Sequence, residues 1–271
     1  MDKKALGKEN REITLKLISI LGYATTRQIA KTLRENELSH SSLNSATRML
    51  RIMRDEKLIL TERLGDLINN EQIAGLADKG ARYLNEEFGD NRTNTRDYMR
   101  HQHAHRTACN SVFCAYPNTR LEVIAALNGR DRTVWSELEI RQGTAPICKF
   151  DFTYDGEKMQ KIPDLLWLGE KDTAEGVQET LVWVEVENNW RSEKDLNKLV
   201  WAMQVMSTKP VYFEFVITKS VAHSIKERLR VKLLHTKETG VPRQQMMRDD
   251  EIWKKLTFKE LNHETLALTD M

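Results

Sequence analysis

The segment LVWVEVE at residues 181–187 constrains the fold more than any other part of the sequence. Aliphatic and acidic side chains alternate in it. Alternate residues of a strand share a face, so Glu185 and Glu187 are expected on one face and Val184 and Val186 on the other. Two carboxylates on one face of an apolar strand are costly unless a cation compensates their charge. The second half of the chain is therefore expected to contain a sheet that carries an acidic site.

A third carboxylate is expected beside this strand, because Pro163-Asp164 starts the apolar run that we predict as its neighbour. Convergent carboxylates suit Mg²⁺ or Mn²⁺, which take hard oxygen ligands. Such an ion polarises a phosphodiester and lowers the pKa of a bound water. The expected metal ligands are Asp164, Glu185 and the Val186 carbonyl, and Glu187 is expected to orient water or a second ion.

The rest of the second half alternates between helical and strand patterns, which is typical of a mixed α/β domain. Glu214 is expected to point outward from its strand, and we assign no role to the tail after Gly240. The expected elements are a helix over 98–116, a strand over 133–141, a hairpin over 147–168, a strand over 179–187, a helix over 193–206, a strand over 211–218 and a helix over 222–235.

The first part of the chain shows the element order of a winged helix-turn-helix. Apolar spacing and capping residues predict helices over 11–21, 25–34 and 42–56. A β-ribbon over 57–76 and a closing helix over 77–88 are expected to follow. In such a module the third helix lies in the DNA major groove, although the same three-helix unit also serves as a protein-interaction module.

The third predicted helix has a polar and cationic outer face. Its apolar stripe of Leu43, Ala46, Leu50 and Met53 turns four other side chains outward, namely Asn44, Thr47, Arg48 and Arg51. The first 60 residues carry twelve Lys and Arg against seven Asp and Glu, whereas the whole chain has a net charge of only +2. These four residues are therefore the expected contacts to double-stranded DNA.

The polar segment at residues 89–97 is the expected linker, which gives a winged-helix domain over 1–90 and a second domain over 97–271. No run of about 18 apolar residues is present, so we expect no membrane span and a cytoplasmic protein. Three irregularly spaced cysteines do not form a disulfide framework, and reduced thiols are expected.

The spacing of Asp164 after Pro163 and Glu185 within a strand resembles the signature of PD-(D/E)xK nucleases, the fold of many restriction endonucleases. The resemblance implies an α+β protein with a restriction-endonuclease-like second domain. That superfamily carries lysine where this chain has Glu187. Some members place the lysine on the following helix, where Lys194 and Lys198 are the available substitutes.

The order of the motifs narrows the resemblance. The chain resembles the replication-relaxation proteins of plasmids, including mobilization relaxases of the MobC type, through its N-terminal module, a helix with a His105-to-Asn110 spacing, "VWSELEIR", "IPDLLWL" and "WVEVENN". The resemblance covers roughly residues 10 to 220 and implies a metal-dependent DNA endonuclease that nicks a plasmid transfer origin during conjugation. It also implies an accessory relaxosome protein and a type IV coupling ATPase as partners.

Other interpretations of the same residues stay open. The chain is alternatively a non-catalytic DNA-binding relaxosome accessory or regulatory protein, as the missing motif lysine suggests, or a restriction or defence nuclease. His103 and His105 match the His-hydrophobic-His motif of another relaxase class. That motif requires a strand, whereas this segment has a helical pattern. A zinc site of His101, His105 and Cys109 is a further alternative, and Glu137 is a candidate supporting carboxylate.

Overall fold

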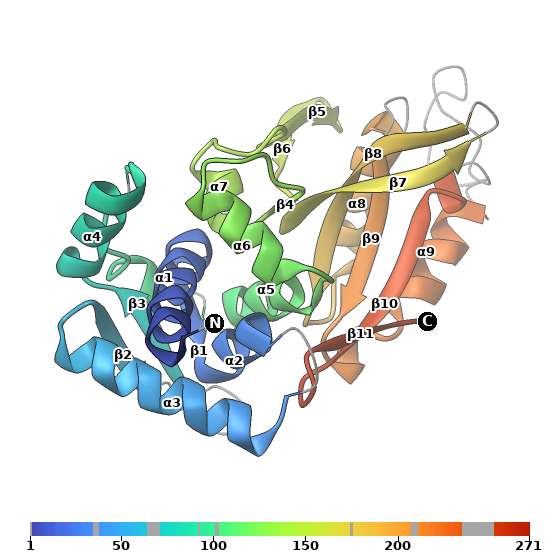
Figure 1. The fold of residues 1–271 in the computed structure, drawn as a ribbon. Coiled ribbons are helices and arrows are strands. Elements are labelled where there is room, and N and C mark those ends of the chain that lie inside the picture. Colours follow the sequence, from blue (N-terminus) through green and yellow to red (C-terminus); the bar gives the residue numbers. More distant parts are fainter. Residues whose placement is uncertain are drawn as a thin grey trace. The chain divides into compact units, whose positions relative to one another are not determined.

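The computed structural model describes residues 2–34, 38–63, 71–91, 93–100, 103–173, 176–206, 211–234 and 252–271 (Figure 1). The chain divides into two compact units, each with its own buried core. The first unit comprises Met1–Glu139 with Asn262–Leu268, and the second comprises Ile140–Leu261 with Thr269–Met271. This division does not follow the linker expected at residues 89–97, because the helices after it pack with the first unit.

The first unit starts with helices and a small sheet. Its three strands form an antiparallel sheet in the order β1-β3-β2. The elements are α1 (Lys3–Leu21), β1 (Tyr23–Thr25), α2 (Thr26–Arg34), α3 (His40–Asp55), β2 (Ile59–Arg63), β3 (Gln72–Leu76) and α4 (Asp78–Phe88). The expected helices and ribbon are confirmed, although α1 begins eight residues earlier than expected. Residues 64–70 of the predicted ribbon lie outside the described residues.

Local capping explains where two of these helices begin. The Thr25 N–H donates to Gln28 Oε1 at 2.8 Å, and the Gln28 N–H donates back to Thr25 Oγ1 at 3.2 Å. Ser39 and Ser42 form the same reciprocal pair before α3. Each pair satisfies amide groups that a helix start leaves without partners.

The later part of the first unit differs from the expectation at one strand. The elements are η2 (Tyr98–Arg100), α5 (His103–Ala115), α6 (Thr119–Leu127), β4 (Val134–Trp135) and α7 (Glu137–Arg141). The prediction of one strand over 133–141 is wrong, because a capping box of Ser136 and Glu139 starts a helix after two strand residues. Glu137, the candidate supporting carboxylate, therefore lies on a helix together with Glu139.

The second unit is built on a mixed sheet. The central strands of this sheet run in the order β10-β9-β8-β7, with β7 antiparallel to β8 and with β8, β9 and β10 parallel. The elements are β5 (Phe150–Tyr154), β6 (Glu157–Lys161), β7 (Leu165–Thr173), β8 (Gly176–Glu187), α8 (Glu193–Met206), β9 (Val211–Ile217), η3 (Ser220–Ala222), α9 (Ile225–Leu234), β10 (Leu256–Asn262) and β11 (Ala267–Asp270). The hairpin predicted over 147–168 is instead β5 paired with β6, followed by β7.

The connection from β8 to β9 positions the candidate site. The two parallel strands are joined through α8, which makes a βαβ unit. Trp183, Phe213 and Phe215 are almost fully buried on these strands. Side chains at the carboxyl end of β8 therefore project from a rigid sheet at the point where the chain turns toward α8, a common place for functional groups in α/β sheets.

The structure is mixed α/β, as the sequence predicted. None of the described helices is long and apolar enough to cross a membrane.

Candidate functional site

Three carboxylates gather at the carboxyl end of β8. Glu185 and Glu187 are 1% and 3% exposed, and Asp164, half-buried just before β7, reaches the strand between them. Its Oδ2 accepts a hydrogen bond from the Val186 N–H at 2.8 Å, and its own N–H donates to the Val184 carbonyl at 3.1 Å. The structure thus brings together the three acidic residues that the sequence singled out.

Two cations compensate the buried glutamates. Lys161, at the end of β6, places Nζ 2.6 Å from Glu185 Oε2. Arg191, in the loop between β8 and α8, donates to Glu185 Oε2 at 2.8 Å and to both oxygens of Glu187 at 2.6 and 2.9 Å. The Trp183 indole N–H donates to the other Glu185 oxygen at 2.8 Å. We call the three carboxylates with Lys161 and Arg191 the charge cluster.

The groups of the charge cluster shift one another's pKa values. Burial raises the pKa of Glu187 to about 7, Arg191 opposes that rise, and the negative charges of Glu185 and Asp164 add to it. The pKa of Arg191 lies above its usual range because the surrounding carboxylates outweigh its burial. A group of buried carboxylates with such a shift is typical of functional sites. The raised pKa of Glu187 indicates that additional positive charge beside these carboxylates would be favourable.

The donor set suits a hard divalent ion in its chemistry. Carboxylate oxygens are the ligands that Mg²⁺ and Mn²⁺ prefer, and a bound cation would favour the ionised form of Glu187. Both oxygens of Glu185 and Glu187, however, already accept hydrogen bonds from protein groups. Each of these oxygens has a further lone pair, so an ion that binds Asp164 and Glu185 would either share them with these donors or displace a contact from Lys161 or Arg191.

The lysines expected to assist the chemistry lie elsewhere on their helix. Lys194 is exposed on the first turn of α8, and Lys198 is half-buried one turn later. Within the described residues, neither lysine is hydrogen-bonded or ion-paired to the charge cluster. Lys161 was missed because it precedes the Pro-Asp pair, where no known spacing marked it.

An exposed tryptophan lies in the same loop as Arg191. Trp190 is 57% exposed, so it is not a core residue. The Arg228 guanidinium stacks on the Trp190 ring at 3.9 Å and donates to the Arg191 carbonyl at 2.8 Å. The loop that carries Arg191 is therefore tied to α9.

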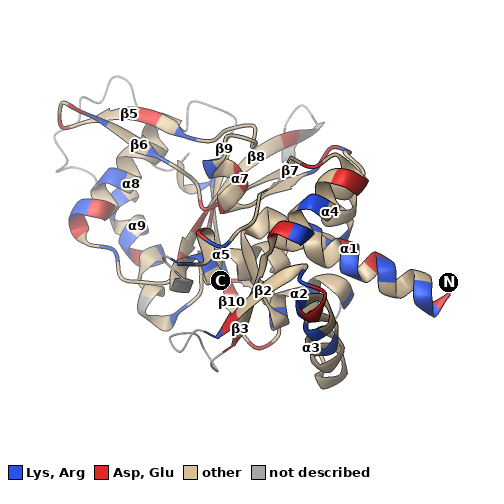
Figure 2. Ribbon diagram, turned by 90° about the vertical axis from the view of Figure 1, so that its left-hand side faces the viewer, with Lys and Arg blue, Asp and Glu red and all other residues tan. Residues whose placement is uncertain are grey.

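The outer face of α3 has the composition that the sequence predicted. Ala46, Leu50 and Met53 are buried, and Leu43 is half-buried. The four residues of the opposite side, Asn44, Thr47, Arg48 and Arg51, are all exposed. Figure 2 shows basic residues along α3 and α1. Neither Arg48 nor Arg51 has an ion-pair partner within the described residues, so both are available to an anionic partner.

The remaining candidate residues lie in the first unit. His105 is on α5, and its Nε2 lies 3.5 Å from Cys109 Sγ. His103 belongs to the same helix, which confirms that the His-Ala-His segment is not a strand. His101 lies outside the described residues. Glu137 is 2% exposed on α7, and its role as a supporting carboxylate stays a prediction.

A family model described as replication-relaxation matches residues 15–186 of the chain, which is more than half of its length. The match includes α3, Asp164 and Glu185 and ends one residue before Glu187. No curated protein and no solved structure matches the chain.

Proposed function

The chain belongs to the replication-relaxation family, and we propose that it is a metal-dependent DNA nickase that acts on a plasmid transfer origin. Membership of the family points to a role in plasmid replication or mobilization. The observation that carries the enzymatic part is the charge cluster at the end of β8. Three carboxylates in a largely buried site, one of them with a pKa raised to about 7, are suited to a divalent ion.

The first unit would provide the DNA contact. The order α1, β1, α2, α3, β2 and β3, with its antiparallel sheet, supports a winged helix-turn-helix. The exposed face of α3 would enter the major groove of double-stranded DNA, with Arg48 and Arg51 reaching phosphates or guanine edges. The second unit supports a restriction-endonuclease-like domain through its mixed sheet and the site at the end of β8.

In the second unit, Asp164 and Glu185 would hold Mg²⁺ or Mn²⁺, with the Val186 carbonyl as a further ligand. The ion would supply Lewis-acid activation of the scissile phosphate and of a bound water. Glu187 would orient the attacking water or a second ion, because a bound cation favours its ionised form. Where the ion replaces Arg191 on Glu185, the guanidinium group would be available to stabilise the negative charge of the phosphate.

Lys161 would take the role that was expected for Lys194 or Lys198. Its ammonium group already contacts Glu185, so it stands where a lysine can orient water beside the metal. A nickase of this kind requires partners that deliver and use the nicked strand. An accessory relaxosome protein and a type IV coupling ATPase are the partners that the family implies.

One observation favours a second function, that of a non-catalytic DNA-binding accessory or regulatory protein. Arg191 bridges Glu185 and Glu187 and provides the positive charge that a metal ion would otherwise bring. If this bridge is permanent, the second unit is a degenerate nuclease domain and the chain acts through DNA binding alone.

A nicking assay tests the proposal. Supercoiled plasmid that carries the cognate origin is incubated with the full chain and Mn²⁺, and the open circular product is measured. We expect nicking by the wild type and a loss of at least a hundredfold in Asp164→Asn, because the amide keeps the hydrogen bond from the Val186 N–H but is a poor ligand. Lys161→Met is expected to lower the rate and to keep Mn²⁺ binding.

The matched control is Glu170→Gln, an exposed carboxylate on β7, which should nick as the wild type does. Origin binding without nicking at any Mn²⁺ concentration would select the accessory function. Cleavage of both strands without a need for the origin would select a restriction or defence nuclease.

A further inference from the structure

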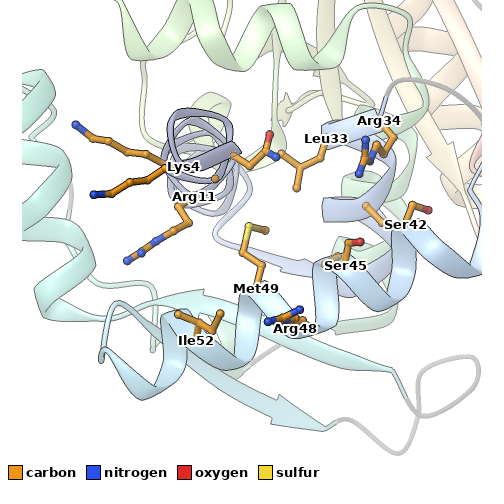
Figure 3. Close-up of a pocket in the computed structure, with 14 residues that line it drawn as sticks. Lys4, Arg11, Leu33, Arg34, Ser42, Ser45, Arg48, Met49 and Ile52 are labelled. Atoms are coloured by element: carbon orange, nitrogen blue, oxygen red, sulfur yellow. The ribbon is translucent and has the colours of Figure 1, made fainter. Parts of the chain in front are cut away.

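A pocket of about 600 Å³ opens in the first unit, between the first half of α1, the end of α2 and α3 (Figure 3). The pattern of apolar residues in α1 and α3 did not predict this pocket. Its volume lies within the range of small-molecule sites, roughly 300–1,000 Å³. Gly7 forms part of its wall, and a Cβ added there would meet no atom within 4 Å. The space beside α1 is therefore open.

The wall of the pocket is apolar toward α2 and α3. Leu33 comes from α2, and Met49 and Ile52 come from α3. Ile52 is 42% exposed and Met49 is half-buried, whereas Leu50 and Met53 of the same helix are buried. A ligand with an apolar body would remove this surface from water, which is favourable.

The rim of the pocket is cationic. Lys4, Lys8, Arg11, Arg34 and Arg48 line it, and no carboxylate is among the described lining residues. Arg11 pairs with Glu56 and Lys8 with Glu12, whereas Lys4, Arg34 and Arg48 have no ion pair within the part of the chain that the structure describes. A rim of this kind favours an anionic head group and disfavours a cationic one.

We propose that this pocket binds a small amphiphilic anion, a carboxylate, sulfonate or phosphate with an apolar body, and that the bound ligand weakens DNA binding by α3. Arg48 links the two events, because it lines the pocket and lies on the outer face of α3. A ligand anion that contacts Arg48 competes with a DNA phosphate for the same charge. This regulatory part rests on the proposed DNA binding, whereas the ligand site does not.

Calorimetric titration of the full chain with decanoate, without DNA, tests the ligand site. The wild type is expected to bind one decanoate, and decyltrimethylammonium, which has the same chain and the opposite charge, is expected to bind at least tenfold more weakly. Gly7→Leu fills the pocket from α1 and should lower decanoate affinity at least tenfold. Gly7→Ala is the matched control, since it gives the same helix-favouring change without filling the space.

Both Gly7 variants should melt at or above the wild-type temperature, so a loss of binding in Gly7→Leu is not a loss of fold. Failure of the wild type to bind decanoate, equal binding of the cationic probe, or unchanged affinity in Gly7→Leu would each overturn the ligand site. In a DNA titration, a decanoate concentration just sufficient to occupy the wild type should lower its DNA affinity severalfold and lower that of Gly7→Leu much less. Equal DNA affinity with and without decanoate would overturn the regulatory part.

DNA titration without decanoate separates the two proposals. A chain that binds decanoate but no DNA keeps the ligand site and loses the proposed function, together with the regulation that depends on it.

Discussion

Arg191 compensates the charge of two buried carboxylates at the end of β8. It bridges Glu185 and Glu187, while Lys161 adds a second cation on Glu185. Breaking a buried ion pair by removing one partner is strongly destabilising, because the other charge stays behind in a poorly solvated place. The charge cluster therefore stabilises the second unit and also forms its candidate site.

Glu185→Gln should lower the free energy of unfolding by about 3 kcal/mol, because it leaves Lys161 and Arg191 with one carboxylate fewer. Urea denaturation of the metal-free protein measures this change. Glu170→Gln, an exposed control on β7, should stay within about 0.5 kcal/mol of the wild type. Equal stability of the two variants would show that the ion pairs of Glu185 contribute nothing.

The three thiols should differ in reactivity. Burial raises the pKa of Cys114 to about 12, and Cys109 is also fully buried, whereas Cys148 is half-exposed. Only the thiolate reacts with iodoacetamide, so Cys148 should be alkylated first at pH 8 and Cys114 only after denaturation. Peptide mass spectrometry over a time course checks the order, and early labelling of Cys114 would contradict the packing around α5.

The partners of single residues were the least predictable feature. The sequence identified Asp164, Glu185 and Glu187, because strand alternation and a Pro-Asp pair are local patterns. It did not identify Lys161, since a contact across 24 residues leaves no local pattern. Glu214 was expected to face outward, and this prediction is wrong: it is 2% exposed and pairs with Lys259 of β10 at 2.7 Å.

At the scale of the element, helices and strands with strong local signals were predicted well, and short or late elements were not. The capping residues of α2 and α3 gave their starts, and α8 has the predicted bounds. Apolar residues of "VWSELEIR" suggested one strand, but the Ser136–Glu139 capping box determines a helix there. β10 was missed because its pairing with β9 is not local.

Removing the capping hydroxyl should destabilise the first unit. The Ser136 hydroxyl accepts from the Glu139 N–H and donates to the Ile20 carbonyl at 2.5 Å. Ser136→Ala should therefore cost about 1–2 kcal/mol of unfolding free energy. Thr47→Ala, an exposed change on α3, should stay within about 0.5 kcal/mol. Chemical denaturation measures the free energy of unfolding of both variants, and equal values would show that the Ser136 cap does not stabilise the first unit.

The outer face of α3 should determine the salt dependence of DNA binding. Arg48→Ala and Arg51→Ala each remove one exposed cation, so each should weaken binding and reduce the slope of log affinity against log salt by about one. Fluorescence anisotropy at several salt concentrations gives the slope. Arg82→Ala on α4 is the control with an equal change of charge, and an equal effect there would place the DNA contact elsewhere.

At the scale of the whole molecule, the family match and the division into units carry different information. The match over residues 15–186 includes the element order of the first unit and the β7–β8 pair that holds Asp164 and Glu185. It ends before Arg191, the residue that most affects the balance between a metal site and a fixed ion-pair network. The order of the motifs predicted the family, the acidic site and the cationic face of α3. It did not predict whether a metal ion or Arg191 compensates the charge of Glu185 and Glu187, because that depends on which cation occupies the space between the two glutamates.

Electron paramagnetic resonance of free Mn²⁺ during titration of the full chain tests whether the charge cluster binds a divalent ion. We expect at least one bound Mn²⁺ for each wild-type chain, at least tenfold weaker binding in Asp164→Asn, and wild-type binding in Glu170→Gln. A wild-type chain that leaves all Mn²⁺ free, or an Asp164→Asn chain that binds it equally well, would contradict a metal centre at the end of β8.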